Sequence, residues 1–172
     1  MPTTPDLLLD TTVLSNFAEA DLLWLLRKHY VERIATSLQV IEELQRGVVS
    51  GYHQLQPVLD SRKTTQTDGW LTVIALHTVE EQQLFTDFSL LLGPGEASCL
   101  ALAMVRRCVL ASDDRRARRV ATLHNVALTG TLGLLLQSVR RQHLGLDEAN
   151  QYLAAMVRNR YRSPVDRLDD LV

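Results

Sequence analysis

The sequence of 172 residues predicts an α/β protein, a three-layer α/β/α sandwich with a parallel sheet of four to five strands. Short apolar runs, typical of buried parallel strands, alternate along the chain with longer segments of helical period. Strands that alternate with helices in this way are usually joined into one parallel sheet by right-handed crossovers. A hydrophobic content of 46% is enough for one substantial core, so we expect a single domain.

The expected domain spans residues 1–172, with a core at about 6–130 and a C-terminal helical extension at about 131–172. The apolar runs predicted to be strands are, in order, 7–9, 33–36, 70–76, 109–111 and 126–129. The segments with helical period begin at residue 11 and continue with 22–30, 38–47, 78–92, 96–107, 114–124, 131–143 and 147–160. The polar segment 50–69 is expected to be partly helical or a mobile surface connection.

Capping and helix-breaking residues mark several of these boundaries. Thr11 and Thr12 follow the first strand, and a threonine hydroxyl can cap the helix that begins there. Ser37 can cap the helix after the second strand, and Gly47 is its expected end. Residues 93–95, with the sequence Gly-Pro-Gly, break the chain before a helix of small residues.

Charge and cysteine content limit the class of protein. The formal net charge is only −2, but the arginines concentrate in the C-terminal half, which allows a local site for a polyanion. Cys99 and Cys108 form no C-x-x-C motif, and we expect buried, reduced thiols. No basic leader precedes the first apolar run, and no apolar stretch approaches the ~20 residues that span a bilayer. These features predict a cytoplasmic protein without membrane insertion.

Acidic residues lie where predicted strands and helices meet, which are the places that converge on one crevice in an α/β fold. They are Asp10, Glu43, Glu96 and the pair Asp113 and Asp114. Carboxylates cost free energy in an apolar framework unless they are paired or hold a cation. Oxygen ligands suit Mg²⁺ or Mn²⁺, and the chain lacks the Cys/His spacing of zinc sites. The pattern predicts a metal-dependent phosphoryl-transfer enzyme.

Each acid also has a purely structural interpretation. Asp10 could cap a helix or be stabilised near the positive end of its dipole, and Glu96 could be stabilised at the start of its helix in the same way. At least one of Asp113 and Asp114 is expected to be an ordinary helix cap. The helical period does not decide between Glu42 and Glu43 as the acid that faces the crevice.

Four motifs in this order resemble the PIN domain, a family best known from VapC-type toxin ribonucleases. They are LDTTVL at 9–14, VIEELQRG at 40–47, GEAS at 95–98 and ASDD at 111–114. The resemblance covers the chain from Leu7 to about Thr131. It implies an endoribonuclease that uses Mg²⁺ or Mn²⁺ to hydrolyse single-stranded RNA. It also implies a homodimer and, for the toxin of a toxin–antitoxin pair, an antitoxin protein as partner.

The resemblance implies a role for each acid. The catalytic residues are Asp10, Glu43, Glu96 and Asp114, and the metal ligands are Asp10, Glu96 and either Asp113 or Asp114. Glu43 and Glu96 complete the coordination or orient the attacking water. The chain departs from typical toxins because Glu96 stands where aspartate is usual and an aromatic residue after the fourth acid is missing. It therefore resembles a poorly characterised branch of the family more than a typical toxin.

Arg115, Arg116 and Arg119 follow the fourth acid and are candidate RNA-binding residues, because guanidinium groups match phosphate geometry. The alternative is a solvated helix face whose arginines pair with acids. A second function also stays open, namely a catalytically degenerate PIN-like module that binds RNA or another protein. Saturable Mn²⁺ binding and metal-dependent cleavage distinguish an enzyme from such a module.

Overall fold

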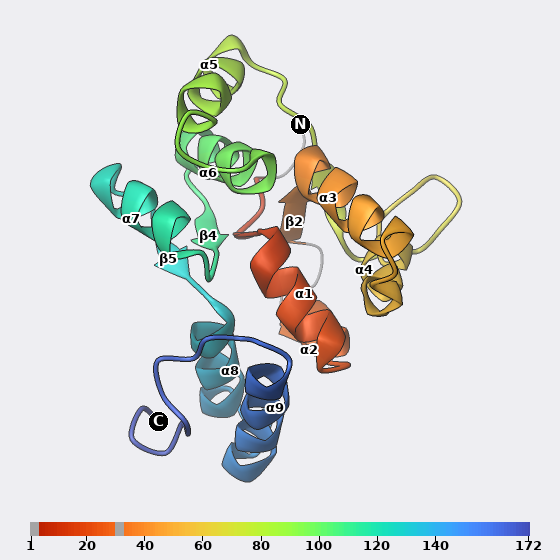
Figure 1. The fold of residues 1–172 in the computed structure, drawn as a ribbon, viewed down its shortest axis with the longest axis vertical. Helices are drawn as coiled ribbons and strands as arrows, with labels where there is room; N and C mark the ends of the chain where they lie inside the picture. Colours follow the sequence, from red (N-terminus) through yellow and green to blue (C-terminus); the bar gives the residue numbers. More distant parts are fainter. Residues whose placement is uncertain (1–3, 30–32) are drawn as a thin grey trace.

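The computed structural model describes residues 4–29 and 33–172, which contain a five-stranded sheet with every neighbouring pair parallel (Figure 1). The strands are β1 (Leu7–Leu9), β2 (Ile34–Ser37), β3 (Thr72–Ile74), β4 (Val109–Ala111) and β5 (Leu128–Thr129). All residues of β1 are buried, although successive side chains point to opposite faces. Both faces of the sheet are therefore covered, as in other parallel sheets. The predicted α/β fold with its parallel sheet is confirmed.

The central strand β1 is the point from which the chain builds the sheet in two directions. The order across the sheet is β3-β2-β1-β4-β5. Leu9 of β1 pairs with Thr36 of β2 and with Ala111 of β4, so the ends of these strands lie side by side. In a parallel sheet, a reversal of strand order opens a crevice at the carboxyl ends of the strands. Here that crevice lies next to Asp10 and residues 112–114.

Helices connect the strands and supply the covering layers. They are α1 (Thr11–Glu19), α2 (Leu23–His29), α3 (Leu38–Val49), α4 (Gln56–Asp60), α5 (Val79–Phe88), α6 (Pro94–Arg106), α7 (Arg115–Leu123), α8 (Thr131–Arg140) and α9 (Leu146–Arg158). A buried run of small and apolar side chains, 97–103, lets α6 pack closely against β1, β2 and β4. The helices α8 and α9 pack against each other and against α1, and lie below the sheet in Figure 1.

The prediction that Gly47 ends its helix is wrong, because α3 continues to Val49. A β-carbon at Gly47 would lie 2.8 Å from the Leu55 side chain, so this glycine provides room for packing rather than a turn. The positive φ of 103° that is typical of a residue after a helix occurs at Gly51. Close packing against a distant residue leaves no local signal, which explains the error.

Other boundaries differ by a few residues. The strands predicted at 70–76 and 126–129 shorten to β3 and β5, and the helices predicted at 78–92 and 131–143 end at Phe88 and Arg140. The end of the helix predicted at 22–30 lies outside the described residues at Tyr30. The segment 50–69 is partly helical as predicted, with a 3₁₀ turn at His53–Leu55 that leads into α4. Among the residues described, no helix is long and apolar enough to cross a membrane.

Candidate active site

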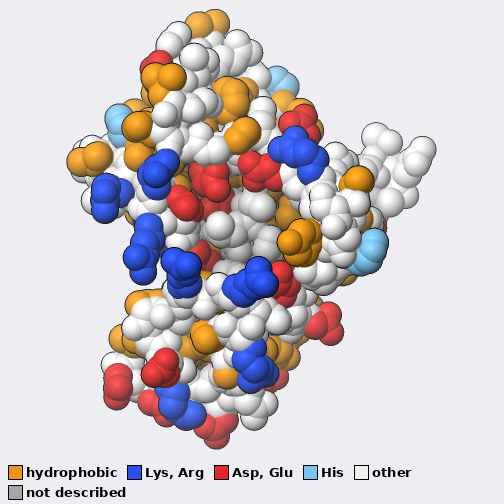
Figure 2. Space-filling view, in the orientation of Figure 1, with side chains coloured by type: hydrophobic (Ala, Val, Ile, Leu, Met, Phe, Trp, Pro, Cys, Tyr) orange, Lys and Arg blue, Asp and Glu red, His pale blue; other side chains and the backbone are white. Residues whose placement is uncertain are grey.

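The five acids come from four elements of the fold and lie around one cleft, whose pockets are lined by Glu96, Asp113 and Asp114. Asp10 follows β1, and Asp113 and Asp114 follow β4. Glu43 extends from α3, and Glu96 lies in the first turn of α6. Figure 2 shows acidic side chains gathered in a hollow in the middle of this face, with basic side chains along its border. The tertiary structure thus brings the predicted acids to the switch point of the sheet.

Asp10 is the most deeply buried of these acids, with 1% of its surface exposed. It caps α1, and its Oδ1 accepts hydrogen bonds from the Thr12 hydroxyl at 2.6 Å and the Val13 amide at 3.1 Å. Its Oδ2 is buried and accepts no hydrogen bond from any residue that the structure describes. Ser112 lies close enough to favour the ionised form without the geometry of a hydrogen bond to Oδ2.

Burial dominates the protonation of Asp10. Desolvation disfavours the carboxylate and raises the pKa of Asp10 from 3.8 to about 7, and the nearby negative charge of Asp113 acts in the same direction. The hydroxyl of Ser112 and the hydrogen bonds from Thr12 and Val13 oppose this rise. A buried carboxyl group with such a pKa, next to a second acid, is typical of a functional site.

Glu43 is the acid of α3 that faces the cleft, whereas Glu42 is exposed to solvent. Its Oε1 accepts a hydrogen bond from the Gly95 amide at 2.8 Å, and its Oε2 accepts one from the Thr11 hydroxyl. A β-carbon at Gly95 would lie 2.4 Å from Oε2 of Glu43, so a glycine is needed for this close approach. The carboxylate is therefore held between the starts of α1 and α6.

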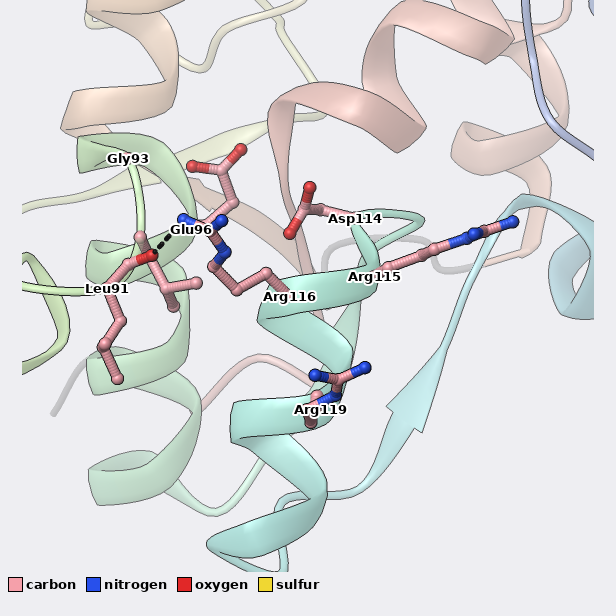
Figure 3. A pocket seen from close by; sticks show the side chains of 8 residues that line it. Leu91, Gly93, Glu96, Asp114, Arg115, Arg116 and Arg119 are labelled. Carbon is pink, nitrogen blue, oxygen red and sulfur yellow. Dashed lines mark hydrogen bonds between the residues drawn. The ribbon is translucent and has the colours of Figure 1, made fainter.

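Glu96 and Asp114 face the same pocket from α6 and α7 (Figure 3). Burial raises the pKa of Glu96, and the negative charges of Glu43 and Asp114 raise it further, which places the three carboxylates within electrostatic reach. Asp114 caps α7, since its Oδ1 accepts the Ala117 amide at 2.7 Å. The prediction that at least one of the aspartates after β4 caps the following helix is confirmed for Asp114.

Asp113 differs from the other acids because protein groups already use both of its oxygens. Its Oδ1 accepts the Thr131 amide at 2.9 Å, and its Oδ2 accepts the Thr131 hydroxyl at 2.5 Å and the Asn16 amide group at 3.0 Å. The Asp113 amide donates to the Thr12 hydroxyl at 3.0 Å. Asp113 therefore joins α1 to the start of α8 across the cleft.

The acids that the structure describes do not form a ready-made metal cage. Within residues 4–29 and 33–172, no three side chains of the Asp, Glu, His or Cys type are close enough to hold one ion together. Mg²⁺ commonly binds to one or two carboxylates and keeps several waters, so its binding does not require such a cage. The unpartnered Oδ2 of Asp10 is the feature that fits an added cation.

The predicted RNA-binding arginines line the mouth of the site. Arg115, Arg116 and Arg119 border a pocket of about 540 Å³ together with Glu96 and Asp114. In Figure 3, Arg115 points away from Glu96, and the Arg116 guanidinium donates to the Leu91 carbonyl at 3.2 Å. None of these three arginines forms a salt bridge with a described residue, so the pairing with acids that the alternative interpretation needs is not observed.

Sequence reasoning missed the polar residues that position the acids. They are Thr11, Thr12, Asn16, Arg118 and Thr131. The guanidinium of Arg118 donates to the carbonyls of Ser112 at 2.8 Å and Thr129 at 2.7 Å, which ties α7 to β4 and β5. The two threonines directly follow Asp10, which is a local signal, but nothing local indicates the other three.

The two cysteines are buried, as expected, and are not paired with each other. Burial raises the pKa of both thiols, and Cys99 donates weak hydrogen bonds to the Leu9 carbonyl and the Ser37 hydroxyl at 3.6 Å each. Cys99 lies near Asp10 and Glu43 but stays a neutral thiol. The thiol therefore adds no negative charge to the carboxylates of the site.

Comparison with known proteins places the chain in a family. A model of PIN domains, described as DUF3368, matches residues 6–172. No curated protein matches the chain. One chain in the crystal structure of VapBC2 from Rickettsia felis bound to a DNA fragment from their promoter has 22% sequence identity and a TM-score of 0.49, and the match covers 72% of this chain and 97% of that one. Because the family model spans nearly all of the sequence, the chain belongs to the PIN-domain family DUF3368.

Proposed function

We propose that this protein is a divalent-metal-dependent endoribonuclease that hydrolyses phosphodiester bonds of single-stranded RNA. The observation that carries the proposal is the buried Asp10 carboxylate, whose Oδ2 has no hydrogen-bond partner among the described residues. An ionised carboxylate in such a place is costly unless it is paired or binds a cation. A divalent cation in the cleft is the partner that this oxygen lacks.

The donor set fits a hard cation. The acidic groups that gather at the site include the carboxylates of Asp10, Glu43, Glu96 and Asp114, and such oxygen ligands suit Mg²⁺ or Mn²⁺. Asp113 is a weaker candidate ligand because three hydrogen bonds already occupy its oxygens. We therefore assign Asp10 and Asp114 as direct ligands, and Asp113 as a positioning residue.

The remaining residues act on the substrate and the water. Glu43, fixed by Thr11 and Gly95, orients the attacking water through hydrogen bonds. Glu96, with its raised pKa, accepts the proton of that water as its oxygen attacks phosphorus and the bond to the leaving oxygen breaks. A bound divalent cation would lower the pKa of the water and stabilise negative charge on the phosphate oxygens.

The direct test compares the wild type with two aspartate variants on a labelled single-stranded RNA. Asp10→Asn removes the negative charge at the switch point, whereas Asp6→Asn removes one at the amino end of the same strand, where Asp6 forms an exposed ion pair with Arg33 at 2.7 Å. We expect Mn²⁺- or Mg²⁺-dependent cleavage by the wild type and by Asp6→Asn, and none by Asp10→Asn. Equal cleavage by all three proteins, all purified in the same way, would contradict the assignment.

A catalytically degenerate module that binds RNA or a protein is the alternative outcome of this test. It predicts RNA binding without cleavage and no saturable response to Mn²⁺. The antitoxin partner and the homodimer stay predictions of the family resemblance. Light scattering of the purified protein tests the homodimer, and co-purification with the product of an adjacent gene tests the antitoxin.

A further inference from the structure

We propose that residues 160–164, here called the C-terminal arm, form a second phosphate-binding wall, so that the RNA strand crosses the acidic site between α7 and the arm. The inference rests on the proposed function and extends it to a part of the chain with no predicted role in RNA binding. The arm follows α9 and returns across the molecule toward the cleft (Figure 1).

The pockets around the acids adjoin one another. The pocket of about 540 Å³ at α7 adjoins a second of about 500 Å³, because Asp114 and Arg115 line both. The second adjoins a third of about 490 Å³, which shares Asp113, Arg115 and Arg162 with it. Each has the size of a small-molecule site, and the shared residues join the three into one groove around the acids. Arg115 lines all three pockets and marks the middle of the groove.

Positive charge is distributed along both sides of this groove. Exposed arginines stand on both sides of the acids, with Arg116 and Arg119 on α7 and Arg160 and Arg162 on the arm. Neither Arg160 nor Arg162 forms a salt bridge with any part of the chain that the structure describes. The acids in the centre repel a phosphate when no cation is present, so a strand needs cationic contacts on both sides of them.

The C-terminal arm is held in place by a buried side chain and a turn. Between the two exposed arginines, Tyr161 is buried with 9% of its surface exposed, and it lines the same two pockets as Arg162. Arg160 has a positive φ of 76°, a strained conformation for a residue that is not glycine. The Ser163 hydroxyl donates to the Val165 carbonyl at 2.6 Å, which closes a turn after the arginines. A preformed wall loses less conformational entropy when it binds a strand.

The ligand that matches this arrangement is a single strand of RNA. Unpaired guanidinium groups recognise phosphates in a planar geometry, and a single strand presents phosphates at regular intervals that can reach both walls. The net charge of the whole protein is −2, so binding to a polyanion must come from such a local surface.

The test measures binding separately from cleavage. In an Asp10→Asn background without metal, we would measure fluorescence anisotropy of a labelled single-stranded RNA of about ten nucleotides at several salt concentrations. Arg162→Glu is compared with the control Arg158→Glu, which reverses an exposed charge at the end of α9, in a pocket that shares Arg160 with the groove but contains neither Arg162 nor the acids of the site. We expect Arg162→Glu to weaken binding about tenfold or more and to lower the salt slope by about 0.7, and Arg158→Glu to change neither.

Equal affinities of the two charge reversals, or no RNA binding by the parent protein, would overturn the role of the arm. Arg162→Gln, which removes the charge without reversing it, should show a smaller loss in the same direction, and circular dichroism checks that each variant is folded. Cleavage by the wild type is scored independently. Binding that depends on Arg162 without any cleavage removes the nuclease proposal and leaves the arm in place.

Discussion

The pH dependence of folding provides a sharp test of the Asp10 site. In the absence of metal, burial raises the pKa of Asp10 from 3.8 to about 7, so the folded state holds a proton that the unfolded state releases. Below pH 3.8 both states are protonated and Asp10 carries no penalty. Between pH 3.8 and about pH 7, the free energy of unfolding falls as the pH rises, and above about pH 7 it levels off. At 1.36 kcal/mol per pKa unit, the full penalty is about 4 kcal/mol.

Asp10→Asn removes this titration but keeps a carbonyl oxygen for the hydrogen bonds from Thr12 and Val13. The stability advantage of the variant over the wild type should therefore grow by about 2–3 kcal/mol as the pH rises from 5 to 8, as linkage with these pKa values requires. Urea denaturation with a chelator present measures this difference at each pH. Asp6→Asn, on the surface at the other end of β1, serves as the control and should show no such gain. A stability difference for Asp10→Asn that does not change with pH would refute the reasoning.

The same variant tests the cation. At about one hundred times its dissociation constant, Mn²⁺ should stabilise the wild type by about 2.7 kcal/mol, a rise in melting temperature of about 5–10 °C for a chain of this size. Asp10→Asn should lose most of that rise. An equal rise in both proteins would show that Asp10 does not bind the ion.

Two further predictions concern residues that position the site. Gly95→Ala should lower the cleavage rate about a hundredfold, because its β-carbon would displace the Glu43 carboxylate. The control Gly145→Ala has open space around its β-carbon, so it should cleave like the wild type in the same assay. Arg118→Ala should lower the free energy of unfolding by about 2–4 kcal/mol, because two carbonyl groups lose their charged donor. Arg119 is exposed, so the control Arg119→Ala should change the free energy of unfolding by less than about 0.5 kcal/mol. Urea denaturation measures both values.

Signals that act over a few residues made much of the fold predictable. The apolar run 7–9, followed by threonines, predicts a buried strand and a helix start, and both occur as β1 and α1, but the residue that caps α1 is Asp10 and not a threonine. Ser37 caps α3 as predicted, with its hydroxyl oxygen 3.1 Å from the Val40 amide. Such signals depend on neighbouring residues, so they can be recognised without knowledge of the tertiary structure. Gly47 was misjudged because its role depends on Leu55, a packing partner outside its own helix.

The assignment of individual acids required the tertiary structure. Glu42 and Glu43 are equivalent by helical period, and only the packing of α3 turns Glu43 toward Gly95 and leaves Glu42 in solvent. Asp113 and Asp114 are adjacent, yet the former holds Thr131 and the latter caps α7. One residue along a helix changes direction by about 100°, so a small rotation set by distant contacts decides which side chain enters the cleft.

The sequence by itself determined the family motifs, the order of strands and helices, and the placement of acids after strands, because these depend on local composition and period. Only the tertiary structure decided that Asp10 is desolvated with one oxygen lacking a hydrogen-bond partner among the described residues, and that Arg162 lines the groove beside the acids. Desolvation depends on every atom packed around a group, and the approach of the C-terminal arm depends on how α9 lies against α8. These are properties of packing between residues far apart in the chain, which no short segment encodes.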